Sequence, residues 1–226
     1  MYLYETHLHT SPVSRCARAS VRDTVEFYKK QGYAGIFLTN HYVEPHRDLE
    51  LFPTFERRIA FLFSDYEKAV EIGNEIGLAV FFGVEISYMG TDFLIYGLDK
   101  TWWLSHPEIE EMKIVDRLTF LADNGALIIH AHPYRESHYI ECIRLFPREV
   151  HGAEIYNANR TLLENEMADI FAEKYGLLPF AGSDNHVAGA QKKFGGLQFA
   201  SPLKDEQDFV QRFKNGEATL FIRENA

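Results

Sequence analysis

The sequence predicts an α/β protein in which a largely parallel sheet closes into a barrel. Short β-type runs alternate with amphipathic helical segments, and about seven such units follow one another along the chain. The chain is 46% hydrophobic and has no Gly-, Ser- or Pro-rich linker, so we expect residues 1–226 to form a single domain. In a barrel of this kind, functional side chains lie at the carboxyl ends of the strands.

The first half of the chain contains two helices with recognisable ends. Ser20, followed three residues later by Asp23, is typical of a helix N-cap, and Gly32 ends that helix. Thr54 caps a second helix, whose apolar face continues as far as Gly77. Apolar runs around these helices predict strands over 2–8, 34–39, 78–84 and 92–98.

The second half repeats the pattern. Pro107 in a first turn and Gly125 at the far end delimit a helix with apolar residues at helical spacing. The same reasoning predicts further helices over 137–146, 163–171 and 204–215, and strands over 126–129, 152–156, 177–181 and 218–222.

Charge and composition argue against several classes of protein. A net charge of −10 disfavours a large nucleic-acid-binding surface, because binding to phosphate backbones depends on clustered Lys and Arg. The first residues lack the basic and apolar regions of an export signal, and no apolar run is long enough to span a bilayer. Cys16 and Cys142 do not make a disulfide framework, so we expect a cytoplasmic protein that binds no membrane.

Residues that can bind a cation stand at the end of nearly every predicted strand. Residues two apart on a strand share a face, so His7 and His9 can point into one pocket. Imidazole and carboxylate together suit Zn, Mn, Fe or Co, and chance would scatter such residues over helices and loops. We therefore predict a polynuclear metal site. The other residues of this kind are His41, Glu85, His130, His132, Glu154, Asp184 and His186.

Several of these residues also have a simpler interpretation. A lone His-X-His pair on a strand is weak evidence for a metal site. His130 follows an apolar run and can be a buried histidine with satisfied hydrogen bonds. Glu154 can be a strand carboxylate that pairs with an arginine. Their joint occurrence at the strand ends is what favours metal binding.

Taken together, these motifs resemble the PHP (polymerase and histidinol phosphatase) superfamily, in that family's order and over essentially the whole chain. The matching segments are ETHLHT at 5–10, TNH at 39–41, GVEI at 83–86, AHP at 131–133 and GSDNH at 182–186. The resemblance implies a distorted seven-stranded β/α barrel with two to three divalent cations (Zn, Mn or Fe) at its carboxyl-terminal mouth.

The resemblance also implies a set of ligands. It assigns the first cation to His7, His9 and Asp184. Glu85 would bridge this cation to the second one, which His132 would also bind.

The third cation would be bound by His41 and His186, but here the sequence departs from the family pattern. Asp92 stands where many members have a ligating His, and it can still bind a hard or borderline metal. Cys16 lies where an Asp or His is common, and it is either a soft ligand or a packed free thiol. Glu5 and Asn40 both replace Asp; at Asn40 this is expected to weaken the support of the neighbouring ligand.

Such a centre is suited to hydrolysis. A water that bridges two cations loses its proton near neutral pH and becomes the nucleophile. Asp184 or His186 could protonate the leaving oxygen. Basic side chains on four loops at the predicted mouth favour an anionic substrate. The candidates are Arg135, Arg160, Arg15 and Lys192.

The sequence therefore predicts a metal-dependent phosphoesterase that hydrolyses a small phosphomonoester, of the histidinol-phosphatase type. One alternative is a phosphodiesterase or exonuclease acting on nucleotides or short oligonucleotides. Another is a metal-binding domain without catalysis, and hydrolysis of a carbon–nitrogen bond would use similar metal chemistry. An insertion over 42–54 is expected to overhang the mouth and to influence specificity.

Overall fold

The computed structural model describes residues 1–45 and 51–224 as a mixed α/β fold. The strands are β1 (Tyr2–Glu5), β2 (Gly35–Leu38), β3 (Ala79–Tyr88), β4 (Thr91–Tyr96), β5 (Leu127–Ala131), β6 (Gly152–Asn157), β7 (Leu178–Gly182), β8 (Lys193–Phe199) and β9 (Thr219–Glu224). The helices are α1 (Val21–Lys30), α3 (Phe55–Ile76), α4 (Lys100–Ser105), α5 (Ile114–Asp123), α6 (Leu162–Tyr175) and α7 (Glu206–Lys214), with short 3₁₀ turns η1 (Pro107–Glu110) and η2 (Ala188–Ala190).

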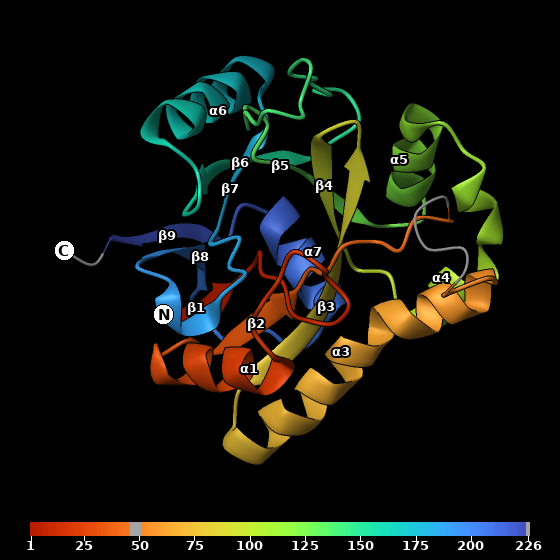
Figure 1. Cartoon of the computed structure of the whole chain (residues 1–226). Helices are drawn as coiled ribbons and strands as arrows, with labels where there is room; N and C mark the ends of the chain where they lie inside the picture. Colours follow the sequence, from red (N-terminus) through yellow and green to blue (C-terminus); the bar gives the residue numbers. More distant parts are fainter. Residues whose placement is uncertain (46–50, 225–226) are drawn as a thin grey trace.

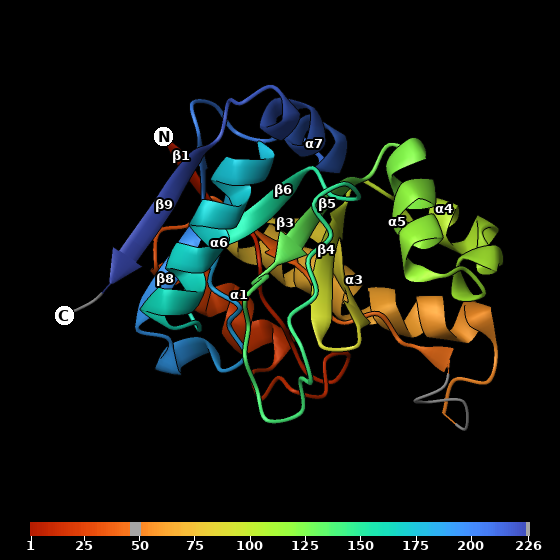
Figure 2. The ribbon, with the colours of Figure 1, turned by 90° about the horizontal axis from the view of Figure 1, so that it is seen from above.

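The strands form one strongly curved sheet in the order β7-β6-β5-β4-β3-β2-β1-β8-β9. β1, β2 and β3 run parallel, as do β5, β6 and β7. The sheet nearly closes on itself, because Gly195 in β8 packs directly against the backbone of Gly182 at the end of β7. The predicted distorted barrel is therefore confirmed, with helices arranged around the sheet (Figure 1 and Figure 2).

Aromatic side chains fill the barrel away from the strand ends that carry the predicted ligands. Phe209 of α7 packs against Phe37 of β2 and Tyr96 of β4, with ring centroids 4.3 and 5.2 Å apart. Phe180 of β7 packs against Tyr96 from another strand. Burial of such large apolar surfaces is the main stabilising contribution to the fold. This aromatic packing fixes the strands relative to one another, and the polar groups lie at the opposite end of the barrel.

The sheet is less uniformly parallel than predicted. β4 runs antiparallel to both β3 and β5. The chain turns directly from β3 into β4 through Met89 and Gly90, which both have positive φ, so no crossover helix is needed between these strands. The predicted strand over 92–98 is confirmed as an element, but it belongs to this hairpin.

One predicted helix is wrong. Residues 137–146 form turns and irregular structure, and Tyr139 and Ile143 are exposed, so the segment has no buried apolar face. The helix predicted from Pro107 is in fact two elements, η1 and α5, and Lys113 precedes the second.

The sequence prediction missed β8, which pairs with β1 and β9 in antiparallel fashion. Gly195 and Gly196 lie within this strand, and glycine weakens the apolar pattern from which a strand is predicted. Both glycines are required here: a Cβ atom on Gly195 would overlap Gly182, and one on Gly196 would overlap the carbonyl oxygen of Tyr4.

The predicted insertion over 42–54 includes residues 46–50, which lie outside the described residues. Among the residues that the structure describes, no helix is long and apolar enough to cross a membrane.

Candidate metal centre

His7 and His9 enter one buried site from the segment that follows β1. The strand ends at Glu5, the chain bends at His7, and Leu8 forms a bridge with Asn185 after β7. Both imidazoles are on the same side of the chain, as the alternation predicted. Both residues are almost completely buried, and their Nε2 atoms lie 3.2 Å apart.

Asp184 approaches both imidazoles from the end of β7. Its Oδ1 atom lies 3.5 Å from Nε2 of His7 and 3.4 Å from Nε2 of His9. Atoms that share a tetrahedral cation at about 2.0–2.1 Å are about 3.3–3.4 Å from each other. The three atoms thus have the mutual spacing of ligands around a single ion.

Glu85 lies between this group and His132, which follows β5. Oε1 of Glu85 is 3.4 Å from Nε2 of His7 and 3.3 Å from Nε2 of His132. This buried oxygen accepts no hydrogen bond from the described residues. An unsatisfied carboxylate oxygen is costly in the interior, and a cation would satisfy it. The donor atoms therefore fit a second ion, which Glu85 would bridge to the first.

Two further side chains orient the histidines. Oε1 of Glu154 in β6 lies 2.9 Å from Nδ1 of His7, and Oγ of Ser14 lies 3.1 Å from Nδ1 of His9. Each contact occupies the far ring nitrogen, which directs Nε2 into the site. Glu154 therefore pairs with a histidine and not with an arginine. Glu154 and Ser14 thus orient the rings of His7 and His9, an arrangement that the sequence did not reveal.

The backbone is strained at two of the predicted ligands. His132 and Asp184 have φ values of 26° and 51°, which non-glycine residues adopt rarely and at a cost of about 1–3 kcal/mol. Hydrogen bonds maintain these conformations: the His132 amide donates to Glu154, and Asn157 donates to the carboxylates of both Glu154 and Asp184. Strain of this kind is concentrated at functional sites.

The charges of the site are strongly coupled. Burial alone would raise the pKa of Glu85, but the imidazoles of His41 and His7 hold that pKa well below its ordinary value. Burial likewise lowers the pKa of His7, but the carboxylates of Glu154, Asp184 and Glu85 outweigh it and raise the pKa well above its ordinary value. Without a cation, the carboxylates are thus compensated by protons on the imidazoles.

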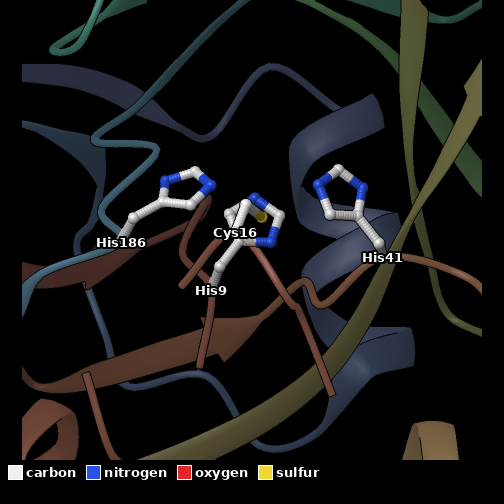
Figure 3. Close-up of side chains that lie close together, drawn as sticks. All are labelled: His9, Cys16, His41 and His186. Atoms are coloured by element: carbon white, nitrogen blue, oxygen red, sulfur yellow. The ribbon is translucent and has the colours of Figure 1, made fainter. Parts of the chain in front are cut away.

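A third group of donors lies at the mouth of the site. Donor atoms of His9, Cys16, His41 and His186 are all within 4.8 Å of one another. Figure 3 shows the four side chains converging from three separate segments of the chain. Asn40 supports this region, since it exchanges two hydrogen bonds with Thr10 at 2.8 and 2.9 Å.

Two other residues at the strand ends have different partners. His130 is buried between the carbonyls of Ala131 and Arg144, and burial lowers its pKa to about 4. The simpler interpretation of His130 is therefore correct. Oδ2 of Asp92 lies 2.9 Å from a guanidinium nitrogen of Arg135 but 3.9 Å from Nε2 of His132.

A cavity of about 1160 Å³ opens above these groups. It is lined by Glu85, His132 and Asp184 and also by Arg135 and Arg160. Its lining also includes the apolar residues Met112, Ile114 and Val115.

The two remaining basic candidates lie elsewhere. Arg15 borders a neighbouring cavity, which shares Cys16 and His41 with the first. Lys192 is exposed and is not among the residues that line either cavity. The structure thus brings two of the four predicted basic residues into one cavity with the metal-binding groups.

Comparisons with known proteins agree with this architecture. Residues 163–190 match the PHP-associated family. A two-domain protein from Bacteroides vulgatus, which contains a predicted PHP-like metal-dependent phosphoesterase, has a TM-score of 0.70 and 15% identity; the alignment covers 97% of this chain but only 64% of that one. No curated protein matches the chain.

Two further solved structures cover nearly the whole of both chains. PsfC from Pseudomonas syringae has a TM-score of 0.63 and 14% identity, covering 100% of this chain and 92% of its own. An amidohydrolase from Chromobacterium violaceum, with bound sulfate and no metal, has a TM-score of 0.55 and 12% identity, covering 96% and 97%. At these identities the likeness is one of fold.

Proposed function

We propose that this chain, which belongs to the PHP superfamily as its motifs predicted, is a metal-dependent phosphoesterase that hydrolyses a small phosphomonoester. The observation that carries the proposal is a single cavity that combines metal-binding donor groups with two guanidinium groups. A phosphate ester needs both, because its charge must be neutralised while the bond to the leaving group breaks.

The proposal assigns two to three divalent cations, Zn, Mn or Fe, to the donor groups. His7, His9 and Asp184 would hold one ion, and Glu85 with His132 would hold a second. When bound, such ions supply a nucleophilic water near neutral pH and neutralise charge on phosphoryl oxygens.

Arg135 and Arg160 would bind the phosphate. Their guanidinium groups are planar forks that match phosphate oxygens, and the Nε atom of each is buried without a hydrogen-bond partner among the described residues. The ion pair with Asp92 holds Arg135 in place. The sequence predicted Asp92 as a metal ligand; we propose instead that it positions Arg135, because it lies closer to the guanidinium than to His132.

Asp184 and His186 both border the cavity and are the candidates to protonate the leaving oxygen. Nδ1 of His186 lies 2.8 Å from the carbonyl oxygen of Asp184, which leaves Nε2 available. Burial lowers the pKa of His186 to about 4, and the imidazoles of His7 and His9 hold the pKa of Asp184 well below its ordinary value. Near neutral pH either group would therefore relay a proton to the leaving oxygen and would not hold one beforehand, and His186 could do so only while its Nε2 is not bound to a cation.

The size and lining of the cavity favour a leaving group beyond the phosphate. At about 1160 Å³ the cavity is large enough for a drug-sized ligand, and its lining includes the apolar residues Met112 and Ile114. The net charge of −10 disfavours long nucleic acids as substrates.

The test is phosphate release by protein that has been stripped and reloaded with Zn, Mn or Fe. We expect one of these forms to hydrolyse phosphomonoesters faster than phosphodiesters. His132→Ala should abolish the activity, and His138→Ala, which changes an exposed histidine outside every donor group, should not. Preferential cleavage of diesters would favour the phosphodiesterase alternative. Bound metal without any hydrolysis would favour a non-catalytic domain.

A further inference from the structure

The loop that follows His9 is anchored on both sides of Cys16. On one side, Oγ of Ser14 lies 3.1 Å from Nδ1 of His9 and accepts a hydrogen bond of 3.0 Å from the amide of His41. On the other side, the amides of residues 18 and 19 donate to the carbonyl of His186 at 2.8 and 3.2 Å. These contacts tie the loop to the imidazole of His9 and to the backbone of His41 and His186.

Cys16 completes a group of donor atoms at the mouth of the cavity. Its sulfur and a nitrogen from each of His9, His41 and His186 lie within 4.8 Å of one another (Figure 3). Cys16 is an exposed residue, yet it lines the cavity that contains the metal-binding carboxylates. Cys142, the other cysteine, belongs to none of these groups and serves as an internal comparison.

Of the three histidines, His9 already belongs to the donor group proposed for the first cation. Its Nε2 lies 3.3–3.4 Å from oxygens of Glu85 and Asp184, within the first donor group, and its Nδ1 contacts Ser14. Nδ1 of His186 lies 2.8 Å from the carbonyl oxygen of Asp184, so Nε2 is the ring nitrogen that would face a cation. Nδ1 of His41 is buried and lies 3.1 Å from Oε2 of Glu85, but it makes no hydrogen bond to the described residues. The donors available to an additional ion are thus two imidazoles and one thiol.

We propose that Cys16 binds the third cation as a thiolate, together with His41 and His186, and that this site selects zinc. A sulfur ligand with two imidazoles is a soft donor set typical of zinc. The carboxylate-bridged pair of ions has harder donors and accepts Mn or Fe as well. The inference rests on the metal-dependent part of the proposed function, but it does not depend on which ester is hydrolysed.

Binding involves no change of oxidation state. The S–H bond breaks, a sulfur–metal bond forms, and the proton passes to solvent, as is usual for metal-bound cysteine. In the metal-free protein the thiol is protonated, since burial first and the carboxylates of Glu85 and Asp184 next raise the pKa of Cys16 to about 11. A cation reverses this preference because it favours the anionic form.

Cobalt titration of the metal-free full chain tests the proposal, since a thiolate bound to Co²⁺ gives a sulfur-to-metal charge-transfer absorption in the near ultraviolet. We expect this band in the native protein and in Cys142→Ser, but not in Cys16→Ser. The number of zinc ions bound per chain should be lower in Cys16→Ser than in the native protein, because the third site would lose its ion. Cys16→Asp should restore a third ion without the band and shift its preference from Zn toward Mn, because carboxylate is a harder ligand.

A native protein that binds its full complement of cobalt without the band would overturn the proposal, as would a band that persists in Cys16→Ser. Far-ultraviolet circular dichroism of each variant shows whether it is folded. The absorption spectrum does not require turnover, so the test of Cys16 is independent of the test of the proposed function. A charge-transfer band without phosphatase activity would support Cys16 as a ligand and contradict the proposed function. Phosphatase activity without the band would support the proposed function and contradict Cys16 as a ligand.

Discussion

The ion pair between Asp92 and Arg135 permits a test of how the cavity holds phosphate. The two charged atoms lie 2.9 Å apart, and at an effective dielectric constant of about 20 their attraction is about 6 kcal/mol before desolvation. Arg135→Met removes the proposed phosphate ligand. A hydrogen bond to a charged group is worth about 1.5–3 kcal/mol, so kcat/KM should fall roughly 10- to 100-fold. Arg148→Met, at an exposed position, is the matched control.

Asp92→Asn separates the two roles considered for this carboxylate. If Asp92 positions Arg135, metal content stays unchanged and KM rises, by less than in Arg135→Met. The double variant should then be little worse than Arg135→Met alone, because both changes remove the same interaction. Metal content by elemental analysis and steady-state kinetics are the two measurements. Loss of a bound ion in Asp92→Asn, with additive kinetic effects in the double variant, would refute the positioning role and restore Asp92 as a ligand.

Three further predictions concern the supporting structure. Glu154→Gln should weaken metal binding about 10- to 100-fold, because it disturbs the contact that orients His7; an unchanged affinity in a metal titration would contradict this role. Metal binding should release protons at neutral pH, since the pKa values of His7 and His9 are raised and both imidazoles must be neutral to bind a cation. Affinity should therefore rise with pH, and calorimetry in buffers of different ionisation enthalpy counts the protons; no release would show that the imidazoles are already neutral. Gly195→Ala should destabilise the barrel by about 1–3 kcal/mol and lower Tm, because its Cβ would overlap the facing strand, whereas Gly189→Ala meets no atom within 4 Å and should leave Tm unchanged.

Much of the metal centre could be predicted because its residues follow strands. Parallel strands bring their carboxyl ends to one edge, so residues as distant in sequence as His7, His132 and Asp184 meet there. The two-residue alternation placed His7 and His9 on one side. Periodicity therefore gave both the location and the orientation of the principal donors.

Other features depend on contacts that no local pattern encodes. Ser14 and Glu154 became recognisable as supports only when the barrel brought them to the far nitrogens of His9 and His7. β8 was missed because glycine is typical of strand interruptions in a local sequence pattern. Here the glycines are needed because Gly195 packs against the backbone of β7. The pairing of Asp92 with Arg135 likewise depends on the antiparallel register of β4 and β5, which places Asp92 opposite Ala131.

The buried charges of the site explain why metal binding and folding should be linked. Glu85, Glu154 and Asp184 are almost wholly buried within one cluster, and burying ionised carboxylates is costly unless positive charge accompanies them. Protons on His7 and His9 supply that charge in the metal-free chain, but only below the raised pKa values of these imidazoles. Bound cations supply the positive charge at any pH at which the imidazoles are neutral. Metal should therefore raise Tm, and the increase should be larger above these pKa values than below them, where protons perform the same compensation.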